Sequence, residues 1–403
     1  ITRRLCTPMR NRRLYKFITW AMLVILSTLL MVLAPTLTAP EYILADDFSH
    51  FWASGKLFVH QENPYQLDEI LKTLHEAGVE PTSQASLGFQ TLNPPWALII
   101  LTPFGLLNYG LARIAWLMIN IILLIIVTRQ FCQIYQGSGN KCWVALLAVF
   151  CFGPTFSVLS KGQVTIWVVL GITSLIMYTT GKINSWWAGV GLVLITLKPQ
   201  LFYLLWPALG FWVIFQRRWK LVITGAIVWL TAILLLHLVN PQIWHQYFAA
   251  AQTYPYDQWA TPTIGSYLRY FWLGLDKFWI QYLPACFGLT WSIFHFLRNR
   301  QNWTWHKQLP ALLLVSLITS PYAWTYDQVI ILPIVICAAF WLSRSVTPFM
   351  IAAWLVYLLI NLADILLHTQ LDDFWFLWLA PAYALWYIAV KHWHERTIPK
   401  QIQ

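Results

Sequence analysis

The sequence predicts an all-α polytopic membrane protein, a bundle of about twelve transmembrane helices. Hydrophobic residues make up 59% of its 403 residues and charged residues only 10%, whereas soluble domains carry roughly 25% charged residues. Apolar runs recur along the whole chain, and we expect each of them to cross the bilayer once. They cover residues 17–37, 111–128, 142–158, 163–180, 184–197, 199–216, 219–239, 276–297, 308–320, 328–343, 346–366 and 374–391.

Basic residues between these runs predict the orientation of the chain. Arginines and lysines cluster before the first run, after the last run and in alternate loops, and such residues are enriched on the cytoplasmic side of a membrane. Both termini are therefore expected in the cytoplasm, and the protein in a plasma membrane or a bacterial inner membrane. Topology explains the net charge of +11 better than nucleic-acid binding does.

The apolar run Pro94–Leu107 would place every later basic loop outside if it crossed the membrane. We therefore interpret this run as a re-entrant or interfacial segment. The first run, 17–37, lacks a small-residue cleavage site and is expected to be an anchor and not a signal peptide; Met9 stays open as an alternative start. The six cysteines show no C-x-x-C spacing, which favours small buried hydrophobic residues over a disulfide or metal framework.

With this orientation, several polar segments gather on the extracytoplasmic face. Polar segments that open toward one side of a bundle are typical of a lined cavity. They are the loops 38–93 and 240–275, which we expect to cover the active site of a single membrane domain spanning 1–403, and the segments Lys161-Gly162-Gln163, Lys198-Pro199-Gln200 and Ser320 to Asp327.

The first of these loops begins with two adjacent aspartates, Asp46 and Asp47. Apolar residues then recur at helical spacing to His60, which predicts a short amphipathic helix on the membrane surface. One aspartate is accounted for as the N-cap of that helix. The other is a candidate general base, since an apolar wall and a neighbouring carboxylate raise the pKa of an aspartate.

Other polar residues on this face are candidates for binding an anionic donor. A lysine there runs against the positive-inside tendency, so Lys161 and Lys198 indicate either contact with a phosphate or a side chain that reaches back to the interface. Asp327 is a second acid, the partner of a basic group, or a helix N-cap. The full set of candidate donor- or substrate-binding residues is Lys198, Gln200, Gln163, Lys161, Arg269, His50, Tyr326 and Asp327.

The chain lacks the motifs of soluble nucleotide-dependent enzymes. It has no phosphate-binding glycine-rich loop, no H-E-x-x-H, no nucleophile elbow and no dinucleotide fingerprint. An activated substrate would therefore come from the membrane, which favours a lipid-linked donor.

Five segments in order resemble glycosyltransferase family 87 of the GT-C superfamily, which includes polyprenol-phosphate-mannose-dependent mannosyltransferases. They are D-F-x-x-F-W-A-S-G-K with N-P-Y (Asp47 to Tyr65), N-P-P-W-A-L with T-P-F (Asn93 to Phe104), G-Q (Gly162, Gln163), L-K-P-Q (Leu197 to Gln200) and S-P-Y-A-W (Ser320 to Trp324).

The resemblance implies a GT-C-like bundle and an inverting transfer of a sugar, such as mannose, from a polyprenyl-phosphate donor to a lipid or glycan hydroxyl. Asp47 would be the general base, with Asp46 as its substitute, and Lys198 and Gln163 would lie near the donor. The family often has histidine after S-P-x-x-W, where this chain has Tyr326-Asp327. No cofactor is expected, although a divalent metal at the Asp46–Asp47 pair stays open.

Two other classes of function remain. A transporter or flippase of a lipid-linked sugar predicts repeats with broken spans in corresponding positions, and the sequence shows no convincing repeat. A structural subunit of a membrane complex predicts no solvent-open cavity beside Asp47.

Overall fold

The structure is a computed structural model that describes residues 47–79, 92–136, 141–254, 260–344 and 347–397. This part of the chain contains 17 α-helices and no strand. The helices are α2 (Asp47–Val59), α3 (Leu67–Glu76), α4 (Ala97–Gly105), α5 (Tyr109–Gln136), α6 (Cys142–Phe150), α7 (Gly153–Ser160), α8 (Thr165–Thr179), α9 (Ser185–Ile195), α10 (Leu205–Gln216), α11 (Trp219–Val239), α12 (Ile243–Thr253), α13 (Ile264–Leu268), α14 (Leu283–Asn299), α15 (Trp305–Ile318), α16 (Leu332–Leu342), α17 (Pro348–Leu367) and α18 (Leu379–Thr397).

Short 3-10 or π segments join several of these helices. They are η2 (Pro199–Leu201), η4 (Arg269–Leu273), η5 (Phe278–Tyr282), η6 (Arg300–Asn302), η7 (Thr325–Ile331) and η8 (Asp373–Trp378).

Five helices of the described chain are long and apolar enough to cross a membrane: α5, α11, the joined η7 and α16, α17, and the joined η8 and α18. The pair α6 and α7 makes a sixth candidate, bent by 61° at the break. Pro154 sits in the first turn of α7, where its missing N–H costs nothing and its ring prevents α6 from continuing. The protein is thus a multi-pass helical membrane protein. The count of twelve crossings stays a prediction, and the first predicted run lies outside the described residues.

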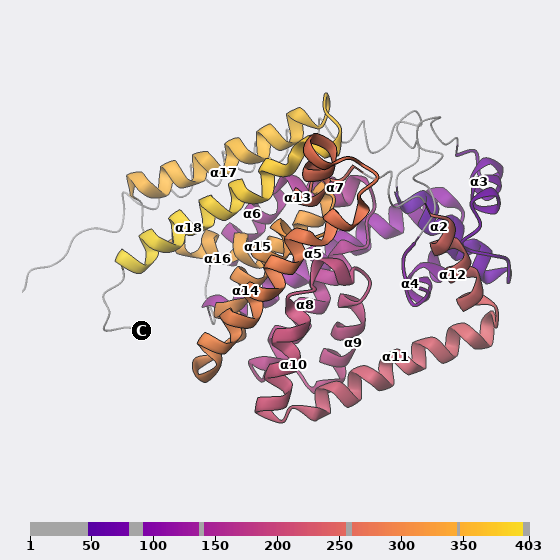
Figure 1. Cartoon of the computed structure of the whole chain (residues 1–403), viewed down its shortest axis with the longest axis horizontal. Helices are drawn as coiled ribbons and strands as arrows, with labels where there is room; N and C mark the ends of the chain where they lie inside the picture. The colour runs from indigo at the N-terminus through magenta and orange to yellow at the C-terminus, as the bar shows by residue number, and fades with distance from the viewer. Residues whose placement is uncertain (1–46, 80–91, 137–140, 255–259, 345–346, 398–403) are drawn as a thin grey trace, which may run out of the picture.

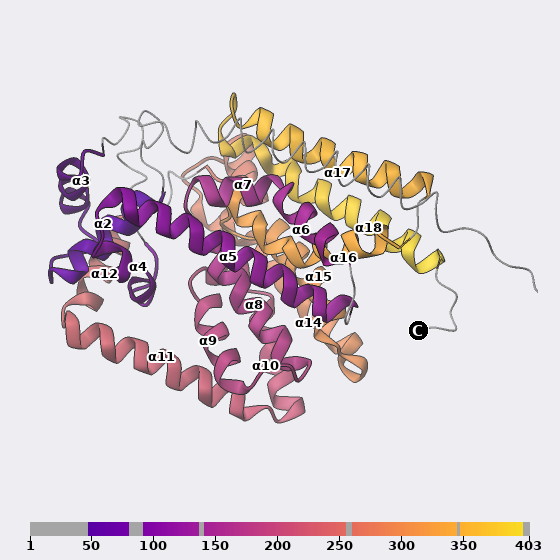
Figure 2. The ribbon, with the colours of Figure 1, turned by 180° about the vertical axis from the view of Figure 1, so that it is seen from behind.

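Almost all of α16 is buried, and it packs against α5, α6 and α18 in the centre of the molecule. Helices α8, α9 and α11 pack in sequence beside this centre. Figures 1 and 2 show α2, α3, α4 and α12 gathered at one end of the molecule, with α11 running along one edge to reach them. A small apolar cluster of Phe58, Tyr65, Leu98, Leu236, Ile243 and Ala250 holds that end together.

The predicted helix after Asp47 forms, but it does not have the one exposed face expected of an amphipathic helix. Ten of the 13 residues of α2 are buried, because α4 packs directly on it. Backbone contact at Gly55 and Gly105 makes this packing close, since a Cβ on Gly105 would lie 2.4 Å from the backbone carbon of Gly55. The amphipathic helix of this loop is α3, which buries Ile70 and Leu74 and exposes its charged side. Helix α4 has nine residues and is too short to cross a bilayer, in agreement with the re-entrant or interfacial interpretation.

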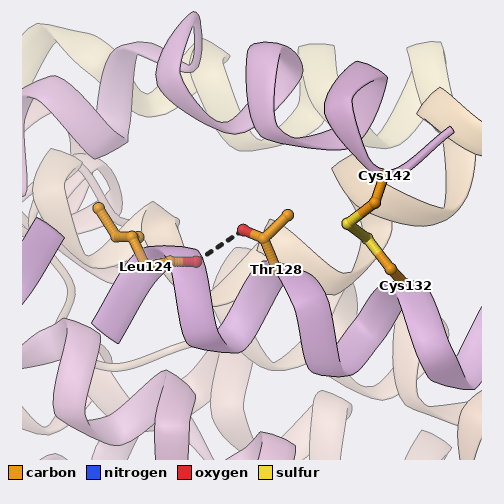
Figure 3. Close-up of a disulfide and its surroundings, with 4 residues drawn as sticks. All are labelled: Leu124, Thr128, Cys132 and Cys142. Atoms are coloured by element: carbon orange, nitrogen blue, oxygen red, sulfur yellow. Dashed lines mark hydrogen bonds between the residues drawn. A yellow bond between two sulfur atoms is a disulfide. The ribbon is translucent and has the colours of Figure 1, made fainter. Parts of the chain in front are cut away.

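The interpretation of the cysteines is wrong for one pair. Cys132 near the end of α5 and Cys142 at the start of α6 form a disulfide with a Cα–Cα distance of 5.8 Å (Figure 3). The residues are ten apart, and the turn from α5 into α6 brings them together, which no local spacing rule detects. One turn before Cys132, Thr128 bonds back to the carbonyl of Leu124 within α5, 2.7 Å away.

Candidate functional site

A line of polar contacts connects four segments that lie far apart in the sequence. Gln163 donates from Nε2 to Oδ2 of Asp47 at 2.6 Å, and its Oε1 accepts a hydrogen bond from Lys198 Nζ at 3.0 Å. The same ammonium lies 2.6 Å from Oδ1 of Asp327. We call Asp47, Gln163, Lys198 and Asp327 the Lys198 cluster. Its members come from the start of α2, the turn between α7 and α8, the residue before η2, and η7.

The turn Lys161–Gln163 is fixed against α2 by its backbone. Gly162 has φ = +66°, and a Cβ at this position would lie 2.5 Å from Cβ of Phe48, so only glycine fits. The Phe48 N–H donates to the carbonyl of Lys161 at 3.2 Å, and Trp116 Nε1 donates to the carbonyl of Gly162 at 2.8 Å. These contacts hold the Gln163 amide against the Asp47 carboxylate.

Asp327 is fully buried and has one of the roles predicted for it, the partner of a basic group, because it pairs with Lys198. It is not the N-cap of η7: that residue is Trp324, and Asp327 lies three positions later, where its Oδ2 accepts from the backbone N–H of Trp324 at 3.0 Å. Thr165 donates a third hydrogen bond to Oδ1 at 3.0 Å. Because a buried charge is costly without such partners, this carboxylate is committed to holding Lys198 and the start of η7.

A second cluster also contacts the Tyr326 ring. Lys161 Nζ is 3.3 Å from Asp373 Oδ2, and His368 Nε2 is 3.0 Å from Asp373 Oδ1. His368 Nδ1 lies 3.0 Å from Oδ1 of Asp364. We call Lys161, Asp373, His368 and Asp364 the Lys161 cluster. The Tyr326 ring joins the clusters, with Lys198 Nζ 4.7 Å and Lys161 Nζ 5.2 Å from its centroid.

Most of the second cluster was not predicted from the sequence, because Asp364, His368 and Asp373 had no expected role. Two signals point to them: Asp364 and His368 are four apart, on one face of a helix end, and the tripeptide D-D-F occurs twice, at 46–48 and 372–374. In both copies the second aspartate begins a helical segment, and both segments reach Lys161 or its carbonyl.

Burial raises the pKa of Asp47 above its ordinary value of 3.8, while Lys161, the Gln163 hydrogen bond and Lys198 oppose the rise. Burial alone would lower the pKa of His368, but its contacts with Asp364 and Asp373 outweigh that effect and raise the pKa to about 9. The Lys161 cluster therefore holds a charged imidazole near neutral pH, and Asp47 is a better proton acceptor than an exposed aspartate.

The remaining predicted residues are placed differently. Arg269 is buried in its own loop, where it donates to Gln281 Oε1 at 3.2 Å and to the carbonyl of Leu275 at 2.6 Å. His50 is buried one turn into α2. Gln200 accepts a hydrogen bond from Ser320 through its backbone carbonyl, at 3.3 Å. Asp46 lies outside the described residues.

In the described part of the chain, no set of three or more His, Cys, Asp or Glu residues is placed to hold a metal ion.

Residues 91–321 match the family model of glycosyltransferase family 87, more than half of the chain. The chain belongs to glycosyltransferase family 87. The resemblance found in the sequence is thereby confirmed, and the protein is a membrane glycosyltransferase that acts on a sugar donor and an acceptor. Neither the curated proteins nor the solved structures gave a match to the chain.

The family 87 match includes some of the site residues and not others. Lys161, Gln163 and Lys198 lie inside the matched range, whereas Asp47 and Asp327 lie outside it. The contacts of Asp47 with the matched segments therefore rest on the structure, which places its carboxylate against Gln163.

Proposed function

We propose that this glycosyltransferase transfers a hexose such as mannose, with inversion, from a polyprenyl phosphate to a hydroxyl group of a lipid or glycan acceptor. One observation carries the proposal. Lys198 pairs with Asp327, and Lys161 and His368 pair with Asp364 and Asp373. Within the described parts of these clusters, Asp47 is the carboxylate whose direct partner is a neutral amide, Gln163.

This arrangement suits a general base. The amide hydrogen bond orients the carboxylate without neutralising it, and Oδ1 has no hydrogen-bond partner among the described residues. In the proposed reaction Asp47 takes the proton of the acceptor hydroxyl, whose oxygen attacks the anomeric carbon. The bond from that carbon to the phosphate oxygen breaks, and polyprenyl phosphate leaves with the electron pair.

Negative charge grows on the leaving phosphate, so nearby cations lower the barrier. Lys161 is the better placed of the two lysines, because 38% of its side chain is exposed, compared with 9% for Lys198. We propose that Lys161 contacts the donor phosphate. Lys198 then orients Gln163 through its hydrogen bond to the amide oxygen and adds a second positive charge near the donor phosphate.

We further propose that the site faces the extracytoplasmic side, that both termini lie in the cytoplasm, and that residues 1–403 form one membrane domain. The loops 38–93 and 240–275 would then lie above the site and select the acceptor. The basic clusters in the sequence support this orientation.

Transfer of radiolabelled sugar from polyprenyl-phosphate donors in membranes tests the proposal. Asp47→Asn is expected to lower the rate by about 100-fold or more, the usual contribution of a general base, while Asp46→Asn separates the roles of the two neighbours. Asp68→Asn, an exposed aspartate of α3 in the same loop, is the matched control and should leave the rate unchanged.

Full activity in the Asp47→Asn protein would refute the assignment of the base. Absence of transfer from every donor tested, with folded wild-type protein, would refute the proposed donor class and favour the transporter or structural alternatives.

A further inference from the structure

The Lys161 cluster contains three ionisable groups that the proposed reaction does not use: Asp364, His368 and Asp373. All three are largely buried, and the imidazole ring stacks on Phe376 with ring centroids 3.8 Å apart. Burying two carboxylates beside a histidine is costly unless the charges are paired and hydrogen-bonded.

The contacts of His368 place its ring between two carboxylates. Nδ1 lies 2.8 Å from the backbone carbonyl oxygen of Asp364, which can only accept, so Nδ1 carries a proton. Nε2 lies 3.0 Å from Oδ1 of Asp373 and 3.1 Å from the hydroxyl of Thr325, which can donate or accept. With Asp373 at Nε2 and the Asp364 side chain 3.0 Å from Nδ1, two anions favour the imidazolium form.

Asp373 divides its two oxygens between two cations. Oδ1 contacts His368, and Oδ2 contacts Lys161 at the longer distance of 3.3 Å. Without the imidazolium, Lys161 would be the one cation of this cluster facing two carboxylates, and Asp373 would bind it more tightly. The histidine thus weakens the hold of Asp373 on Lys161.

Lys161 in turn acts on Asp47. Its carbonyl accepts the N–H of Phe48, the residue after Asp47, and its ammonium is the charge that most lowers the pKa of Asp47, whereas Asp373 raises that pKa. The net charge of the Lys161 cluster therefore affects the pKa of Asp47, the proposed base.

We propose that His368 is a positioning residue, whose imidazolium occupies Asp373 and leaves the Lys161 ammonium free to act on Asp47 and on the donor phosphate. This inference rests on the proposed function for its catalytic consequence. Its structural part, the competition of His368 and Lys161 for Asp373, does not depend on the substrate.

The charged and ionisable groups around His368 and Asp47 come from every element of the site. They are Asp364 on α17, Asp373 on η8, Lys161 after α7, Lys198 before η2, Tyr322 before η7, Asp327 and Tyr326 on η7, and Tyr383 on α18. Single substitutions that remove opposite charges from this set should shift the titration of Asp47 in opposite directions.

The first experiment measures that shift in the pH dependence of sugar transfer. His368→Gln removes a positive charge and should move the acidic limb of the rate profile to higher pH by roughly 0.5–1 unit, the range expected for one charge a few ångströms away. Asp373→Asn removes a negative charge and should move it to lower pH. His60→Gln, at an exposed site just after α2, is the matched control.

The second experiment needs no substrate. An amine-acylating reagent is applied to the full-length protein in lipid nanodiscs, and labelling of Lys161 is measured by peptide mass spectrometry, with exposed Lys72 as internal reference. Tighter pairing with Asp373 should slow labelling of Lys161 about 3- to 10-fold in His368→Gln, because a stronger charge-assisted contact makes the amine less available to the reagent. Asp373→Asn should speed it.

Unchanged Lys161 labelling in both variants, or acidic limbs that move in the same direction, would overturn the proposal. Asp373→Asn keeps the test decisive if His368→Gln does not fold. If wild type transfers no sugar, the proposed function fails, while the labelling result still decides whether His368 controls Lys161.

Discussion

Replacing Lys198 by methionine separates the contribution of the buried ion pair to folding from its contribution to transfer. Methionine keeps most of the length of the side chain but leaves Asp327 buried without a cation. Loss of one partner of a buried ion pair costs about 3–5 kcal/mol. Thr165 and the Trp324 N–H still donate to this carboxylate, so we expect a value near the lower end, about 3 kcal/mol.

The expected change in melting temperature follows from the size of the protein. With an unfolding entropy of about 2 cal/mol/K per residue, a chain of 403 residues loses about 1 °C for each kcal/mol, so Lys198→Met should lower Tm by about 3–4 °C. Tryptophan fluorescence of the protein in nanodiscs measures this shift. Sugar transfer is assayed well below the transition.

The double variant Lys198→Met, Asp327→Asn removes both charges but keeps an oxygen that accepts from Trp324. Its Tm should return most of the way to wild type, because no charge is left buried alone. Transfer should stay low, since Gln163 has lost the cation that orients it. A double variant as unstable as the single variant would refute the energetic argument, and recovery of transfer would show that Lys198 acts on folding alone.

Three further predictions concern the base, the metal and the disulfide. Transfer needs Asp47 in its ionised form, and burial raises the pKa of this group. The transfer rate should therefore fall as the pH drops through a value above 3.8. A rate that stays constant down to about pH 4 would contradict this prediction. EDTA should leave transfer by wild-type membranes unchanged, and loss of activity restored by a divalent ion would point to a metal at Asp46 and Asp47. Cys132→Ser should lower the free energy of unfolding by about 2–3 kcal/mol, the value expected for a disulfide that closes a short loop. Cys286→Ser, which replaces an exposed free thiol, should not change it. Equal melting curves for wild type with and without reductant would contradict the disulfide.

The disulfide also bears on the orientation of the chain. Cys132 and Cys142 lie near Arg129 and Lys141, in a loop that the basic residues assign to the cytoplasm, where structural disulfides are rare. Alkylation of intact cells with a membrane-impermeant maleimide, before and after reduction, measures on which side these sulfurs lie. Labelling from outside would reverse the predicted orientation of this loop.

Hydrophobic periodicity and length predicted the helices well. Each predicted crossing within the described residues overlaps a helix, because a bilayer requires long apolar segments whose backbone groups bond internally. The same information does not reveal what covers a short helix. Helix α2 was expected on the membrane surface with one face exposed. Instead α4 packs on it, with Gly105 against Gly55, and buries most of its residues.

For the Lys198 cluster, the sequence predicted which residues belong to it but not how they pair, whereas three of the four members of the Lys161 cluster were not predicted. Asp47, Gln163, Lys198 and Asp327 were all predicted on one face, and the structure brings them into contact. The ion pair of Lys161 with Asp373 joins residues 212 positions apart. Local patterns fix which face of a helix is polar, but the neighbour of a given turn depends on how the whole bundle packs.

The charges of the two clusters explain why Asp47 differs from the other carboxylates. Three cations, Lys161, Lys198 and His368, are each within 3.3 Å of a partner carboxylate among Asp327, Asp364 and Asp373. These three aspartates balance the three cations, and Asp47 remains as the surplus anion, bonded to Gln163. Burial raises the pKa of this surplus carboxylate, although Lys161 and Lys198 lie near it and oppose the rise. Such a group can accept a proton while the neighbouring lysines stabilise the charge that develops on a leaving phosphate. Asp47 and Lys161 can thus act on different parts of the substrates without forming an ion pair with each other.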